Sequence, residues 1–316
     1  MMKPQKSAGL ALMAMVLSGL AAPALAVDRT DPIVVPLVSD TSSDVIAKIL
    51  GSTLAEAGYR VDYVQADYTA SFSGIQTGDL HYTICWQSTW ELCEGSTEGG
   101  KAENVGSTGI SSAEGWWYPL SLKEQCPGLP DWKALKEPAC IEALATAETA
   151  PKARFVEGPA DWVMPVSEMA AAFDINVEPI PSGSAAALVA TISAAARRGE
   201  PVIGWGYTPH WYFMSDEGEF VQFPEFEEEC YTDPAWGTNP DATHDCGVKV
   251  GSLWVYANSE LLAEEPDAKA IMGAFELSDS QIADVFRSID VDGTPLDEAV
   301  ETWMTGNEAV WSVWIN

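Results

Sequence analysis

The pattern of apolar and polar positions alternates between strand and helix in the first third of the chain. Short apolar runs predict strands at 33–38, 60–64 and 80–85. A helix capped by Ser42 or Ser43 and ended by Gly58 is predicted after the first strand, and a shorter helix over 70–76 after the second. This β-α-β-α-β order implies right-handed crossovers and a mainly parallel sheet, in which ligands bind beyond the carboxyl ends of the strands.

The middle of the chain repeats the alternation. Strands are predicted at 153–156, 175–180 and from 201 onward, with helices at 163–173 and 185–198. Ser182 or Ser184 can cap the second of these helices, and Gly199 ends it. The C-terminal part, 267–315, is helical by its spacing. Because 316 residues exceed one typical domain, we expect an α/β fold with two lobes.

The N-terminus carries the pattern of a secretory signal peptide. Lys3 and Lys6 precede an apolar run over 10–20, and Ala24-Leu25-Ala26 forms a small-residue cleavage site. The first cysteine is Cys85, so a lipid anchor at the cleavage point is not expected. Residues 1–26 are therefore predicted to be removed, and the mature protein is predicted to be free in the periplasm. The lobes are predicted as 27–115 with 212–316 for lobe I, and 116–211 for lobe II.

Thirteen tryptophans form the next signal, because several stand beside turn residues in four short segments. These segments are CWQSTW (85–90), EGWWYP (114–119), EGPADW (157–162) and GWGYTPHW (204–211). Three of them follow predicted strands. Indoles at the ends of strands suggest a cage for a group that favours a π-face, such as a methylated ammonium, a sugar ring or a base.

The charge of the chain narrows the choice of partner. Asp and Glu number 47 against 16 Lys and Arg, which gives a formal net charge of −31. Such a surface repels nucleic-acid phosphates and anionic membranes, so neither is expected to bind. Six cysteines in an exported chain fit three local disulfides, and the spacing suggests Cys85–Cys93, Cys126–Cys140 and Cys230–Cys246.

The order of these elements resembles a known family. A Ser-rich loop and helix, then GDLHYT leading into Trp86, and later GW-x-x-TPHW, are similar to the periplasmic substrate-binding proteins of quaternary-amine ABC transporters. The resemblance implies a type II periplasmic binding fold with the ligand cleft between the lobes. It also implies capture of glycine betaine, choline or a related methylated amine, delivery to a membrane permease, and no catalysis.

The resemblance implies an aromatic box around the methylated nitrogen. Carried over by motif, its walls are Trp86, Trp162 and either Trp205 or Tyr207, with Trp211 closing the last motif. Adjacent residues of an extended strand face opposite ways, so one of Trp116 and Trp117 is expected to add a fourth wall. Trp117 is the preferred choice.

Polar side chains that reach the cleft are expected to recognise the part of the ligand beyond its methylated nitrogen. The four tryptophan segments contain no Lys or Arg, and the nearest are Arg154 and Lys123. Asp40 and Glu114 are placed to reach the cleft instead. Carboxyl groups favour choline or trimethylamine N-oxide over the carboxylate of glycine betaine, although a helix N-terminus near Ser42 can still bind a carboxylate. The acidity and EGWWYP resemble the trimethylamine N-oxide-binding members.

Two alternatives remain open from the sequence. A secreted carbohydrate-binding protein or glycosidase would use the indoles as stacking platforms, but Ala, Gly, Pro and Tyr flank them rather than residues that satisfy sugar hydroxyls. The acidic stretch 223–246 offers oxygen ligands for Ca²⁺. A solvated acidic hairpin is the favoured interpretation of that stretch, and no cofactor is required by a monomeric binding protein. The Ca²⁺ candidates are Glu229, Asp233, Asn239, Asp241 and Asp245.

Overall fold

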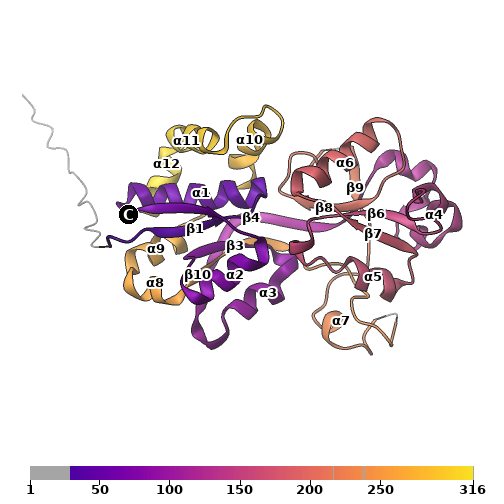
Figure 1. The fold of residues 1–316 in the computed structure, drawn as a ribbon, viewed down its shortest axis with the longest axis horizontal. Helices are drawn as coiled ribbons and strands as arrows, with labels where there is room; N and C mark the ends of the chain where they lie inside the picture. Colours follow the sequence, from indigo (N-terminus) through magenta and orange to yellow (C-terminus); the bar gives the residue numbers. More distant parts are fainter. Residues whose placement is uncertain (1–28, 216, 238, 316) are drawn as a thin grey trace, which may run out of the picture.

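The chain folds into two groups of elements joined by one long strand (Figure 1). The computed structural model describes residues 29–215, 217–237 and 239–315, so the predicted signal peptide lies outside the described residues. We call the group that contains α1–α3, β1–β3, β10 and α8–α12 the first lobe, and the group that contains β5–β9 and α4–α7 the second lobe. Strand β4 (Ala102–Pro119) runs through both. The two-lobed α/β class predicted from the sequence is confirmed.

The first lobe begins as predicted, with two parallel strands and two helices. The elements are β1 (Ile33–Leu37), α1 (Thr41–Glu56), β2 (Val61–Gln65), α2 (Tyr68–Thr77) and β3 (Tyr82–Cys85). The predicted cap of α1 is wrong by two or three positions. Asp40 is the N-cap, and its carboxylate accepts hydrogen bonds from both the N–H and the hydroxyl of Ser43. A carboxylate is the stronger acceptor, so Ser43 donates to the cap instead of forming it.

The sheets are less parallel than the sequence predicted: the β1–β2 sheet is parallel, but the seven-stranded sheet is mixed. Strand β10 (Gly251–Asn258) lies antiparallel between β3 and β4, and β8 (Gly204–Thr208) pairs antiparallel with β4. Parallel pairing is found between β1 and β2 and among β6 (Ala153–Glu157), β7 (Val177–Pro181) and β8. Strand β10 thus lies in a sheet between two strands, β3 and β4, that come much earlier in the sequence.

The second lobe contains α4 (Pro138–Leu144), α5 (Val166–Phe173) and α6 (Ala185–Arg197). Ser184 caps α6 as predicted, because its hydroxyl accepts from the N–H of Ala187. The prediction that α5 begins at Val163 is wrong. Val163 has a left-handed φ of 53°, which ends the preceding turn, and the helix starts after Pro165.

The C-terminal part predicted as helical, 267–315, is helical in the structure, and the helices from Ser259 onward pack on the first lobe (Figure 1). These helices are α8 (Ser259–Glu264), α9 (Pro266–Ala274), α10 (Asp279–Asp290), α11 (Leu296–Gly306) and α12 (Glu308–Trp311). Trp303 and Trp314 are buried here, so these indoles belong to the core of the first lobe. The remaining short elements are β5 (Pro127–Pro130), β9 (Gly218–Phe220), α3 (Trp90–Ser96) and α7 (Glu229–Thr232).

The lobe boundaries at 115/116 and 211/212 stay a prediction. Strand β9 pairs with residues 117–119 of β4, and Asn239 Nδ2 donates to the carbonyl of Ala172 at 2.9 Å. A boundary therefore has to keep 218–220 and Asn239 with the second lobe. The sequence of 212–250 has no clear helix or strand periodicity from which these contacts with the second lobe could be predicted.

The structure contains the disulfides Cys85–Cys93, Cys126–Cys140 and Cys230–Cys246. The first of them links the last residue of β3 to α3 and closes the segment that carries Trp86. Within the described ranges, no helix has the length and apolar character needed to cross a membrane.

Candidate functional site

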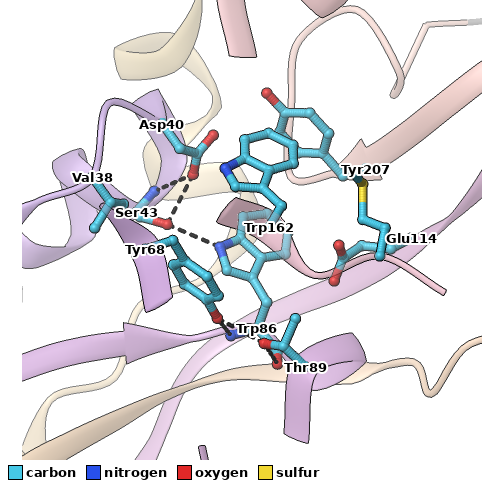
Figure 2. Close-up of a pocket in the computed structure, with 10 residues that line it drawn as sticks. Val38, Asp40, Ser43, Tyr68, Trp86, Thr89, Glu114, Trp162 and Tyr207 are labelled. Atoms are coloured by element: carbon cyan, nitrogen blue, oxygen red, sulfur yellow. Dashed lines mark hydrogen bonds between the residues drawn. The ribbon is translucent and has the colours of Figure 1, made fainter. Parts of the chain in front are cut away.

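A cavity lined by aromatic and carboxyl side chains lies between the lobes (Figure 2). Trp86 follows β3, Trp162 lies in the turn after β6, and Glu114 and Tyr207 face each other on β4 and β8. Strand ends supply Trp86 and Trp162, because the chain leaves the sheet there and its side chains become free to face the cleft, whereas Glu114 lies within β4. The lining residues are Val38, Asp40, Ser43, Tyr68, Trp86, Thr89, Glu114, Trp162, Met164 and Tyr207.

Two indoles each meet the phenol ring of Tyr207 at nearly a right angle in this cavity. The ring centroids of Trp86 and Tyr207 lie 5.6 Å apart with an interplanar angle of 87°. Those of Trp162 and Tyr207 lie 5.4 Å apart at 88°. Both indoles thus stand perpendicular to the phenol ring, one from each lobe. Perpendicular walls present π-faces to the same volume, which is the arrangement that a compact methylated cation requires.

The Trp86 wall is held by hydrogen bonds at both ends. Its indole Nε1 donates to Ser43 Oγ at 2.9 Å, and its backbone N–H donates to the Tyr68 hydroxyl at 3.0 Å (Figure 2). Ser43 Oγ in turn donates to Asp40 Oδ2 at 2.8 Å. The indole therefore cannot rotate without breaking a chain of buried hydrogen bonds, which preorganises the wall.

Asp40 and Glu114 supply the two carboxyl groups of the cavity. Burial raises the pKa of Asp40, against the opposing effect of the Ser43 donors and the Tyr207 hydroxyl. Its Oδ1 has no hydrogen-bond partner of normal geometry among the described residues, although the Tyr207 hydroxyl is close enough to lower the pKa. A buried acceptor in this state is available to a ligand.

Burial also raises the pKa of Glu114 to about 7. The hydroxyl of Ser88 donates to Glu114 Oε1 and partly opposes this shift. The Trp205 indole acts in the same direction, although its Nε1 makes no hydrogen bond of normal geometry within the described structure. Glu114 is therefore divided between its neutral and charged forms near neutral pH, so it can either donate a hydrogen bond or pair with a cation.

The cavity has no basic side chain among its described lining residues. Lys123, one of the two nearest cations in the sequence, pairs with Glu219 in the second lobe. Rings and carboxyl groups thus set the chemistry of the site. An anionic ligand group placed here would meet two acidic groups and no compensating charge.

The structure brings five of the eight predicted ligand residues together: Asp40, Trp86, Glu114, Trp162 and Tyr207 line the cavity. Of the Trp205 and Tyr207 pair, it is Tyr207 that lines it. Trp117 and Trp205 have no exposed surface and lie outside the lining. Trp211 lines a separate, neighbouring cavity with His210 and Asp290.

Trp116 and Trp117 are both in the core because β4 lies inside the sheet and is covered on both faces. Trp116 packs against Phe155 and Phe223, with centroids 4.7 and 5.3 Å away. Trp117 packs against Tyr212 and Phe213 at 5.3 and 5.4 Å. Alternation along the strand therefore separates two buried faces here, rather than a buried face from a cleft.

Sequence reasoning missed five lining residues, Val38, Ser43, Tyr68, Thr89 and Met164, as parts of the ligand site. Tyr68 carried a usable signal: it is an aromatic residue in QADYT, four positions after the predicted end of the strand 60–64 and three after the end of β2. The rule that identified Trp86 applies to it equally. The others are small or apolar residues with no distinguishing pattern.

The acidic stretch does not gather its side chains around a common point. Asp245 Oδ2 accepts from the N–H of Asn239, Asp233 Oδ1 accepts from Ala235, and Asn239 Oδ1 accepts from Asp241. No group of three or more His, Cys, Asp or Glu side chains in the described part of the chain is arranged to hold a metal ion.

A cavity of aromatic rings between two α/β lobes defines the class of the two-lobed solute-binding proteins. Residues 31–306 match the profile of the substrate-binding domain of the ABC-type glycine betaine transport system. The trimethylamine N-oxide-binding protein of Pelagibacter ubique (strain HTCC1062) is 30% identical over 300 residues, which cover 91% of each chain. The chain therefore belongs to the family of substrate-binding proteins of ABC-type glycine betaine transport systems, whose members are transport proteins and not enzymes.

Solved structures show the same fold. A choline-binding protein of an ABC transporter, in complex with choline, matches with a TM-score of 0.71 at 15% identity, covering 90% of this chain and 91% of that one. Lactococcal OpuAC in its closed form with glycine betaine matches with a TM-score of 0.65 at 14% identity, covering 90% and 100%. At these identities the likeness concerns the fold alone.

Proposed function

We propose that this chain is the periplasmic receptor of an ABC importer and that its cavity captures trimethylamine N-oxide, with choline and glycine betaine as weaker ligands. The observation that carries this is the combination of three converging rings, Trp86, Trp162 and Tyr207, with two carboxyl groups of raised pKa and no lining cation. The identity to a trimethylamine N-oxide-binding protein supports the same ligand.

The rings recognise the methylated nitrogen. Its positive charge is spread over methyl groups that cannot donate ordinary hydrogen bonds, so the negative faces of aromatic rings are the natural partners. Each ring contributes about 0.5–2 kcal/mol, more when water is excluded. Three rings acting together supply a large part of the roughly −8 kcal/mol that micromolar binding requires.

The carboxyl groups discriminate among the candidates. The oxygen of an N-oxide accepts hydrogen bonds, so it favours a neutral carboxyl that donates one. Burial keeps Glu114 largely neutral below pH 7 and about half neutral at pH 7. Choline is a full cation with no anionic group, so it favours an ionised carboxylate. The carboxylate of glycine betaine meets neither a cation nor a basic side chain in the described lining and is expected to bind most weakly.

Calorimetric titration with trimethylamine N-oxide, choline, glycine betaine and a neutral sugar tests the proposal. Trp86→Ala is expected to weaken amine binding at least about tenfold, since it removes one wall. The control is Trp132→Ala, which truncates an indole packed on Phe173 away from the cavity and is expected to leave affinity unchanged. Binding of the sugar without any response to the amines would overturn the proposal in favour of a carbohydrate-binding protein.

The same proposal covers partners and cofactors. The receptor acts as a monomer, delivers its ligand to a membrane permease and requires no cofactor. A single mass by light scattering tests the first statement. Titration with Ca²⁺ tests the last: heat release abolished by Asp245→Asn would assign a Ca²⁺ site to the acidic stretch, whose Asp245 is buried.

A further inference from the structure

We propose that Asp161 is a positioning residue that fixes the Trp162 wall by capping a helix of the opposite lobe. The inference rests on the proposed function, because it concerns the affinity of the cavity for its amine. Asp161 belongs to the turn Ala160–Trp162 of the second lobe. Its Oδ2 accepts a hydrogen bond from the backbone N–H of Tyr68, the first residue of α2 in the first lobe, at 2.9 Å.

The bond satisfies a backbone N–H at the start of α2 that has no acceptor within the helix. The first N–H groups of a helix have no partner inside it, and a side chain at the N-cap normally accepts from one of them. Asp67 occupies the N-cap of this ten-residue helix, but within the described structure its side chain makes no capping bond. The carboxylate of Asp161 takes over part of that role from the other lobe, where it also faces the positive end of the helix.

Both residues joined by this bond adjoin walls of the cavity. The ring of Tyr68 lines the cavity, and its hydroxyl accepts from the N–H of Trp86. Trp162, directly after Asp161, is the wall that the second lobe contributes. A single hydrogen bond therefore ties the Trp162 turn to the residue that supports Trp86, so it sets the position of one indole relative to the other.

The backbone of the turn around Trp162 is conformationally restricted. Val163 has a left-handed φ of 53°, and Pro159 and Pro165 restrict the backbone on both sides. Gly158 lets the indole lie against the main chain, because a Cβ there would come within 2.7 Å of Trp162 Cε3. With the backbone so restricted, loss of the Asp161 bond is expected to displace the turn as a unit rather than to unfold it.

The bond joins the two lobes, so it exists only while they are in contact. Two-lobed binding proteins admit a ligand by separation of the lobes. That separation breaks the bond between Asp161 and Tyr68. Because the bond re-forms after the ligand has entered, its loss should raise the dissociation rate and leave the association rate nearly unchanged.

The test compares Asp161→Ala and Asp161→Asn with Asp131→Ala, measuring trimethylamine N-oxide binding by stopped-flow tryptophan fluorescence. Asp131 is a matched control, since its carboxylate caps the N–H of Lys133 at 3.0 Å within one lobe. Asp161→Ala is expected to raise the dissociation constant about fivefold, through the dissociation rate. Asp161→Asn retains an acceptor and should lose less, while Asp131→Ala should leave affinity unchanged.

A coupled variant separates positioning from a general effect on folding. In a Trp162→Ala background, Asp161→Ala should cause a much smaller further loss, because its effect passes through that indole. Wild-type affinity in Asp161→Ala, or full additivity with Trp162→Ala, would overturn the inference. Failure of the proposed function is distinguishable, since then the wild-type protein and Asp131→Ala would also show no response to any amine.

Discussion

The pH dependence of ligand preference is expected to arise from the titration of one side chain, Glu114. Burial raises its pKa to about 7 from a usual value of 4.5, so the carboxyl changes from neutral to charged within an accessible range. If the neutral form donates to the N-oxide oxygen, binding of trimethylamine N-oxide should weaken as the pH rises. Choline should behave in the opposite way, because the charged carboxylate attracts its ammonium group.

The size of the effect follows from the fraction of protein in the competent form. With a pKa of about 7, about nine tenths of Glu114 is protonated at pH 6 and about one tenth at pH 8. The apparent dissociation constant scales inversely with that fraction. The dissociation constant for trimethylamine N-oxide should therefore rise about tenfold between pH 6 and pH 8, while that for choline should fall.

Calorimetric titration of both ligands at pH 6, 7 and 8 measures the profiles, and Glu114→Gln supplies the control. The amide is always neutral and can always donate, so its affinity for trimethylamine N-oxide should stay near the low-pH wild-type value at every pH. Its affinity for choline should be lower than that of the wild type at pH 8. Asp40 remains in this variant, so any residual slope measures its contribution.

A wild-type affinity for trimethylamine N-oxide that is constant, or rises, from pH 6 to pH 8 would rule out neutral Glu114 as the donor to the N-oxide oxygen. A slope that survives unchanged in Glu114→Gln would assign the titration to another group. If choline and trimethylamine N-oxide shared the same slope, the carboxyl would not discriminate between a cation and an N-oxide, and the preference proposed for this site would fail.

Three further results are expected. Tyr207→Phe keeps the ring but removes the hydroxyl that lowers the pKa of Asp40. By calorimetry, the affinity for trimethylamine N-oxide should change less than about threefold, because the ring remains. Choline binding should weaken, because Asp40 is then less ionised. Replacing Cys126 and Cys140 by alanine should lower the free energy of unfolding by about 3 kcal/mol without changing ligand affinity, by denaturant titration. Glu114→Gln should raise the melting temperature at pH 8 but not at pH 4, because the raised pKa of the wild-type carboxyl costs stability as the pH rises from 4.5 through 7. An unchanged melting temperature at pH 8 would contradict the burial argument.

Much of the fold could be predicted from local pattern. Helices α1 and α6 have apolar faces and polar residues at their N-termini, so their extents were close to the observed ones. Strand β4 was not predicted: its sequence, AENVGSTGISSAEGWWYP, is rich in small polar residues and lacks a clear alternation. Its pairing with β10, some 140 residues later, depends on long-range contacts that no local window contains.

The site was predictable where a motif coincided with a strand end. Trp86, Trp162 and Tyr207 were found in this way, whereas Asp40 and Glu114 were proposed only as acids placed to reach the cleft. Trp117 was the preferred fourth wall because an adjacent pair in an extended strand implies two different environments. Since β4 is covered on both faces, the two environments are both core, and this depends on the position of the strand within the sheet.

Strand β4 runs through both lobes and carries a residue proposed to set ligand preference, whereas two walls of the cavity come from other segments. Glu114 lies on this shared strand, whereas Trp86 and Trp162 are supplied by segments that belong to one lobe each. On the role proposed for Glu114, a substitution at this position is expected to change which amine is preferred while the hydrogen bond between Asp161 and Tyr68 stays in place. Ligand preference could then change by single substitutions without a change in the contact between the lobes.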